Sequence, residues 1–139
     1  MLRALSVAAL LLPLMAHAAS ACPASFEEYL SAFQRDPLFQ NEHRQFPLRY
    51  SFLDPDAEVE PRTVKHRLSA AQAEKERGIS FPSLELEKAK GLQRKVTKAK
   101  KEAYVVRFDK PDSDAFSIEF HFSRVGHCWQ LVEVNDFSL

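Results

Sequence analysis

The sequence has few of the residues on which common catalytic motifs depend. Only three glycines occur among 139 residues, so no glycine-rich phosphate loop is possible, and no G-x-S-x-G elbow is present. The two cysteines are far apart, which excludes a C-x-x-C redox or zinc pair. His43, His66 and His127 do not have the spacing of zinc ligands. We therefore expect no cofactor and no metal, and no motif specifies an activity.

A charge excess is also absent. Nineteen Lys and Arg residues balance nineteen Asp and Glu residues. Proteins that bind nucleic acid or anionic membranes through their overall charge carry a clear excess of basic residues. The composition therefore gives no support for a nucleic-acid partner.

Long apolar runs are missing apart from one near the start, residues 4–15. This run is shorter than the roughly 18 apolar residues expected of a membrane-spanning helix. Arg3, the apolar run and the A-H-A triplet that follows have the order of a secretory signal peptide. We expect a signal peptide over residues 1–18, cleaved after Ala18, and a single periplasmic or secreted domain over residues 19–139.

The exported part keeps two cysteines, Cys22 and Cys128. An oxidising compartment permits disulfides, and we predict that these two residues pair. The closed loop would hold just over a hundred residues, for which chain entropy gives about 4 to 5 kcal/mol of stabilisation. The alternative is an envelope lipoprotein, because residues 19–22 resemble a lipoprotein processing site in which Cys22 carries the lipid.

Capping residues and apolar spacing predict the N-terminal elements. Ser25, with a glutamate three residues on, predicts a helix over residues 25–35 with one apolar face. Pro37 suits the first turn of a short second helix. Alternation of apolar and polar residues then predicts strands over 46–53 and 63–68.

Two more helices are expected in the middle of the chain. The first begins at Ser69 and runs to Gly78, which suits a C-terminal stop. The second covers residues 83–90, and we expect its residues Leu84 and Leu86 to enter the core.

The strongest local charge feature is a basic strip between residues 88 and 101, with seven basic residues and no acidic one. The strip fits either a helix or a strand, and we favour a strand. It can simply protect an exposed sheet edge, which is a common use of lysine. It can also dock a protein or an anionic envelope partner. Nucleic acid is disfavoured because no aromatic residues interleave the charges. The candidate partner-binding residues are Arg94, Lys95, Lys98, Lys100 and Lys101.

Residues 103–134 predict the body of a sheet. Two alternating segments, 104–108 and 116–123, flank a turn and must form an antiparallel hairpin. The last segment, 128–134, is apolar on both sides, which is typical of a central strand.

These elements indicate an α+β fold in which helices pack on a curved antiparallel sheet. Two parts of the sequence carry a pattern of their own, namely the segment 129–136 and the residues Phe26, Phe33, Asp36, Phe39, Gln40, Phe46, Pro47 and Leu48. These two parts resemble a family of exported bacterial domains of unknown function with the cone-shaped nuclear-transport-factor-2-like fold. The resemblance implies the fold and carries no activity with it.

The fold that the resemblance implies includes isomerases and dehydratases that use an Asp or His base and a Tyr donor inside the cone, and the candidates for these roles are Tyr50, Tyr104, His121 and Asp136. The alternation predicts that His121 faces away from the core, and Asp136 follows the last predicted strand. We therefore expect a non-enzymatic binding domain, such as an immunity protein or an inhibitor. The alternative is a small-ligand receptor or enzyme with Tyr50, Tyr104 and Trp129 around a pocket inside the cone.

Overall fold

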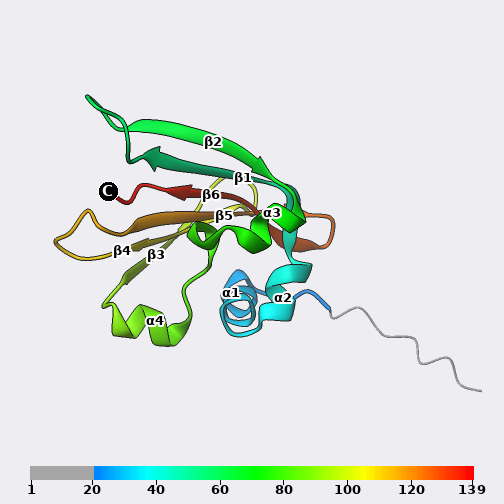
Figure 1. The fold of residues 1–139 in the computed structure, drawn as a ribbon. Coiled ribbons are helices and arrows are strands. Elements are labelled where there is room, and N and C mark those ends of the chain that lie inside the picture. The colour runs from blue at the N-terminus through cyan, green and yellow to red at the C-terminus, as the bar shows by residue number, and fades with distance from the viewer. Residues whose placement is uncertain (1–20) are drawn as a thin grey trace, which may run out of the picture.

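The computed structural model describes residues 21–139, and the predicted signal peptide lies outside them. No helix of this described part is both long and apolar enough to cross a membrane. Figure 1 shows the order of the elements along the chain. They are α1 (Phe26–Arg35), α2 (Pro37–Glu42), β1 (Arg44–Asp54), β2 (Arg62–Leu68), α3 (Ala70–Lys75), the 3-10 helix η1 (Arg77–Ile79), α4 (Leu84–Ala89), β3 (Gln93–Lys98), β4 (Tyr104–Asp109), β5 (Ser117–Val125) and β6 (Cys128–Asp136).

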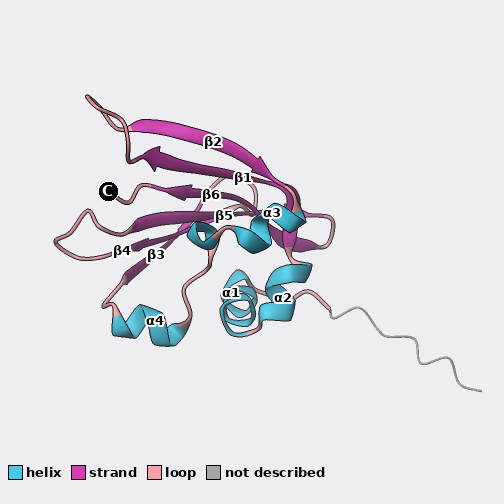
Figure 2. Cartoon of the chain, in the orientation of Figure 1, coloured by secondary structure: helices cyan, strands magenta, loops and turns pink. Residues whose placement is uncertain are grey.

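One six-stranded sheet has the order β2-β1-β6-β5-β4-β3. Neighbouring strands are antiparallel except β1 and β6, which are parallel. The helices lie on one side of the curved sheet (Figure 2). The predicted α+β fold, the hairpin of β4 and β5, and the central position of the last strand are confirmed. The strand predicted within the basic strip is also confirmed, and it forms one edge of the sheet.

Local capping explains where the first two helices begin. The Ser25 side chain accepts a hydrogen bond from the Glu28 backbone N–H at 3.2 Å, which satisfies a free donor of the first turn of α1. Asp36 ends α1 and then caps α2, where its carboxylate accepts from the Leu38 N–H at 2.9 Å. The buried face of α1 is set by helical spacing and consists of Phe26, Tyr29, Leu30, Phe33 and Gln34.

Aromatic side chains fill the space between α1 and the inner face of the sheet. The ring centres of Phe33 and Phe122 lie 5.1 Å apart, and those of Phe81 and Phe120 lie 4.7 Å apart, in edge-to-face geometry. Strand alternation directs the apolar residues of β4, β5 and β6 to this face, where they are buried. They include Val106, Phe108, Ile118, Phe120, Phe122, Trp129, Leu131 and Val134.

Two expectations for the middle of the chain are wrong. The helix from Ser69 has the predicted capping box but ends at Lys75, and Gly78 lies in η1 rather than at a helix stop. The Tyr50 hydroxyl lies against the position that a Cβ at Gly78 would occupy, so the glycine permits a close approach. The helix beginning at Ser83 forms as predicted.

The second correction concerns the buried residues of this region. Leu84 and Leu86 on α4 are 41% and 39% exposed, so they do not enter the core. The core residues here are Ile79 and Phe81, which precede α4 and are 1% and 7% exposed. A six-residue helix at the sheet margin can bury little of its surface, whereas the extended segment before it crosses the core.

The disulfide between Cys22 and Cys128 is present, as predicted, with Cα atoms 5.3 Å apart. It joins the segment before α1 to the first residue of β6, across a sequence separation of 106 residues. A lipidated cysteine needs the same sulfur for its thioether, so the disulfide and the lipoprotein alternative exclude each other.

Candidate functional site

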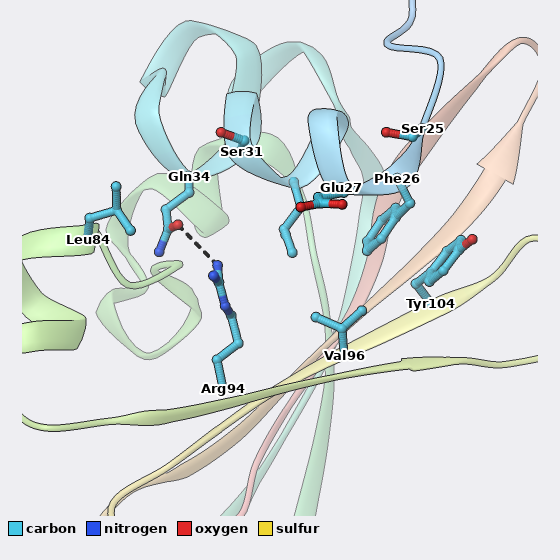
Figure 3. Close-up of a pocket in the computed structure, with 10 residues that line it drawn as sticks. Ser25, Phe26, Glu27, Ser31, Gln34, Leu84, Arg94, Val96 and Tyr104 are labelled. Atoms are coloured by element: carbon cyan, nitrogen blue, oxygen red, sulfur yellow. Dashed lines mark hydrogen bonds between the residues drawn. The ribbon is translucent and has the colours of Figure 1, made fainter.

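A cavity of about 630 Å³ lies between α1 and the edge strand β3, with Leu84 of α4 at one end and Tyr104 of β4 at the other (Figure 3). We call it the β3 groove. Arg94 and Val96 point from β3 toward α1 in this view. The groove is lined by Ser25, Phe26, Glu27, Leu30, Ser31, Gln34, Leu84, Arg94, Val96 and Tyr104.

The floor of the β3 groove is apolar. The rings of Phe26 and Tyr104 stack with their centres 3.9 Å apart and their planes within 3°. Val96 is 46% exposed, although strand alternation places it on the inner face of the sheet. An exposed apolar residue on the inner face means that the core does not extend to β3, and the groove is the space left beside it.

Hydrogen bonds inside the protein hold Arg94 at the wall of the groove. Arg94 donates from Nη1 to Gln34 Oε1 at 3.2 Å, and its Nε lies 3.7 Å from Glu87 Oε1. Gln34 in turn donates to Glu87 Oε2 at 2.9 Å and to the Pro82 carbonyl at 3.0 Å. Arg94 is exposed, but Glu87 and Gln34 already hold its guanidinium group, so less of its charge is available to a partner.

The other basic residues of the strip lie on different surfaces. Strand alternation places Lys98 on the groove side and Lys95 on the outer face of the sheet. Lys100 and Lys101 lie in the turn between β3 and β4. All four are exposed. The strip is therefore a basic sheet edge and turn rather than one continuous patch.

The structure brings together only two of the three residues predicted to line a pocket. The ring centres of Tyr104 and Trp129 lie 6.1 Å apart, and Trp129 donates from Nε1 to the Glu102 carbonyl at 2.8 Å. Tyr50 lies elsewhere, under η1 and beside β2. Burial, together with the charges of Glu76 and Asp136, raises the pKa of Tyr50 to about 12.

Aromatic side chains fill the interior of the cone, where the alternative interpretation of the sequence predicts a ligand pocket. Phe26, Phe33 and Trp129 are buried there, and Phe39 packs against them. Tyr29 is fully buried, and its hydroxyl has no hydrogen-bond partner among residues 21–139. Burial raises the pKa of Tyr29 far above its ordinary value. These side chains therefore fill the interior, and the open space beside α1 is the β3 groove.

Only one pair of the candidate acid–base residues comes together, because Tyr50 and Asp136 line a cavity of about 290 Å³ with Glu76, whereas Tyr104 and His121 lie elsewhere. His121 lies on the outer face, as predicted, where its Nε2 is 3.1 Å from Glu119 Oε2 and 3.2 Å from Asn135 Nδ2. Asp136 pairs with Phe52 and Ile118, so alternation places it on the inner face. Within the described range, no group of three or more His, Cys, Asp or Glu side chains could hold a metal ion.

The sequence patterns did not predict the groove. Two of its apolar residues are Val96, the one large apolar side chain within a basic strand, and Leu84, which helical spacing predicts to lie in the core. Phe26, Leu30 and Tyr104 also line it. The sequence feature that could have indicated an exposed groove is the isolation of Val96 among polar and charged residues of its strand. A buried strand would have carried an apolar residue at every second position.

Neither a protein-family model nor a curated protein matches the chain. Among solved structures, the chain is similar to a nuclear-transport-factor-2-like protein from Bacteroides fragilis, with 18% identity and a TM-score of 0.59. The match covers 82% of this chain and 47% of that one, so the chain spans about half the length of the Bacteroides protein.

A nuclear-transport-factor-2-like protein of unknown function from Shewanella baltica is also similar, with 15% identity and a TM-score of 0.45. That match covers 79% of this chain and 87% of that one. The Bacteroides match carries the conclusion: the chain has the nuclear-transport-factor-2-like α+β fold, as the resemblance implied. Identities this low extend to the fold and not to the activity.

Proposed function

We propose that the protein is exported, after cleavage behind Ala18, as a non-enzymatic binding protein that holds an extended segment of a partner protein along β3. One observation carries the proposal. Every residue of the edge strand β3 is exposed, and the strand borders a groove of about 630 Å³ with an apolar floor. The disulfide and the predicted signal peptide support an oxidising compartment outside the cytoplasm.

An edge strand offers free backbone N–H and C=O groups to a second extended chain. In this mode of recognition, backbone hydrogen bonds supply affinity, and alternate side chains of the bound segment enter pockets. The β3 groove lies directly beside that edge and offers Val96, Leu30 and Leu84 to apolar side chains of a partner. An extended segment with apolar residues at every second position fits this arrangement.

Charge makes an acidic partner the best fit. Lys98 on the groove side and Lys100 and Lys101 in the adjacent turn are exposed, and none has an ion-pair partner within the described residues. The same charges repel a second copy of β3 and so discourage pairing between identical edges. An acidic segment removes that repulsion and gains attraction at the edge.

The test uses peptides of random sequence displayed against the immobilised, disulfide-bonded domain. We expect selected peptides to alternate apolar and acidic residues and to protect the β3 amides from hydrogen exchange. Val96→Glu should raise the Kd of a selected peptide by about tenfold or more, since burial of the valine side chain contributes about 1.5 kcal/mol or more to binding.

Thr97→Glu is the matched control, because Thr97 is the exposed neighbour of Val96 on the opposite face of the same strand. Lys98→Glu and Lys95→Glu form a second pair across the two faces, and only Lys98→Glu should weaken binding strongly. Equal binding by Val96→Glu and Thr97→Glu, or protection of β2 instead of β3, would reject the proposal.

A second candidate is a small apolar ligand in the same groove. Its volume lies within the range of about 300 to 1,000 Å³ typical of ligand pockets, and the Phe26–Tyr104 stack offers an aromatic surface. Trp129, the single tryptophan, contacts both rings and reports on such a ligand by its fluorescence. A saturable fluorescence change with a small apolar compound, without any peptide selected, would favour this candidate.

A further inference from the structure

The outer face of the sheet, opposite the helices, carries a group of basic side chains that the β3 groove does not involve. Strand register places Arg49 of β1 directly opposite Arg67 of β2, and Lys65 opposite Ser51 on the same face. Like charges directly opposite on neighbouring strands destabilise a sheet. Edge protection accounts for Lys65 and Arg67 on the edge strand β2, but not for Arg49, because β1 lies inside the sheet.

Two hollows share these side chains. A cavity of about 380 Å³ is lined by Arg49, Lys65 and Arg67, together with Ser51 and Asn135. A second cavity, of about 340 Å³, is also lined by Arg49 and Arg67. Arg49 and Arg67 therefore line both hollows.

The negative charge nearby does not balance the three basic groups. Glu133 is the one acidic residue lining either cavity, and its Oε2 lies 2.9 Å from Arg49 Nε. Among residues 21–139, Lys65 and Arg67 have no carboxylate within ion-pair distance. Ser51 and Asn135 are hydrogen-bonded to each other, at 2.5 Å between Oγ and Oδ1, so they add polarity without charge.

We infer that Arg49, Lys65 and Arg67 form a binding site for a small tetrahedral oxyanion, a phosphate or sulfate, either free or as the monoester of a small molecule. Arginine forks match two oxygens of such a group, and lysine supplies a further point charge. The anion relieves the repulsion between Arg49 and Arg67. This site lies on the opposite face of the sheet from the β3 groove, so it does not rest on the proposed function.

The experiment is a ¹H–¹⁵N NMR titration of the disulfide-bonded domain, with sodium chloride holding the ionic strength constant. Inorganic phosphate, inorganic sulfate and glycerol 3-phosphate are the probes. The expected result is a saturable shift of β1 and β2 amides by at least one probe. Tighter binding of glycerol 3-phosphate identifies a monoester site, and tighter binding of an inorganic ion identifies a free-anion site.

Matched variants assign the site to these residues. Lys65→Glu and Arg67→Glu should raise the Kd by about tenfold or more, the effect of losing a charged hydrogen bond. Lys110→Glu makes the same charge change at an exposed turn and should leave the Kd unchanged. The Kd of Arg67→Lys should lie between those of the unchanged protein and Arg67→Glu, because lysine keeps the positive charge but lacks the two parallel N–H donors of the guanidinium group. Linear, unsaturable shifts with all three probes, or equal losses in Lys65→Glu and Lys110→Glu, would overturn the inference.

Discussion

Replacing Tyr29 with phenylalanine should stabilise the protein. Tyr29 is 0% exposed, and six aromatic rings lie within 6 Å of its ring centre, between 5.4 and 5.9 Å. Its hydroxyl has no partner among the described residues. An unpaired buried hydroxyl costs about 1 to 3 kcal/mol. Tyr29→Phe keeps the ring packing and removes that cost, so we expect the free energy of unfolding at pH 7 to rise by about 1 kcal/mol.

The same residue should make the protein sensitive to alkali. Burial raises the pKa of Tyr29, whereas tyrosine in an unfolded chain ionises near pH 10. Below pH 10 the hydroxyl is neutral in both the folded and the unfolded chain, so its ionisation does not lower stability there. Above pH 10, the unfolded chain loses a proton that the folded protein keeps, so stability falls by about 1.4 kcal/mol per pH unit. Tyr50, whose pKa is raised to about 12, adds a similar loss between pH 10 and 12.

Urea unfolding followed by Trp129 fluorescence, between pH 7 and pH 11, measures both effects. Tyr29→Phe should lower the number of protons released on unfolding above pH 10 by one. Tyr104→Phe is the control, because its half-buried ring lines the groove and its hydroxyl is not among the unpaired buried groups. A loss of more than about 1 kcal/mol at pH 7 would show that the Tyr29 hydroxyl is hydrogen-bonded, and the reasoning would fail.

Four further outcomes are expected. Replacing Cys22 and Cys128 with serine should lower the free energy of unfolding in urea by about 4 to 5 kcal/mol, and a loss below about 1 kcal/mol would contradict the loop-closure estimate. Phe33→Ala should cost about 3 to 5 kcal/mol in the same assay, because Phe33 is 0% exposed. Glu102→Gly should raise the melting temperature, since Glu102 has a positive φ of 60°, and a decrease would show that its side chain outweighs the backbone strain. Intact mass of the exported protein should match an N-terminal Ala19 with one disulfide and no lipid.

Local signals in the sequence were sufficient for most of the fold. Capping side chains fix where α1 and α3 begin, and alternation fixes which face of each strand is buried. These signals involve only a few consecutive residues, so they can be recognised without knowing which parts of the chain pack against them. The outward position of His121 followed from the same alternation.

Features that depend on contacts between distant parts of the chain could not be predicted from the sequence. Leu84 has the spacing of a buried helical residue, yet α4 lies at the margin of the sheet, where no further strand covers it. Tyr50 and Tyr104 have the same parity on their strands, but β1 and β4 are separated by β6 and β5, so the two rings cannot share a pocket. Only strand order, which the sequence does not state, distinguishes these cases.

Strand order also changes the meaning of the basic strip. A run of seven basic residues suggests one charged surface, but a strand sends successive side chains to opposite faces. Arg94 pairs with Glu87 and Gln34 inside the protein, and Lys95 faces away from the groove. A partner at the β3 groove therefore meets Lys98 and the turn beyond it. Charge reversal across the whole strip would mix structural damage at Arg94 with lost binding, whereas the Lys98 and Lys95 pair separates the two faces of the strand.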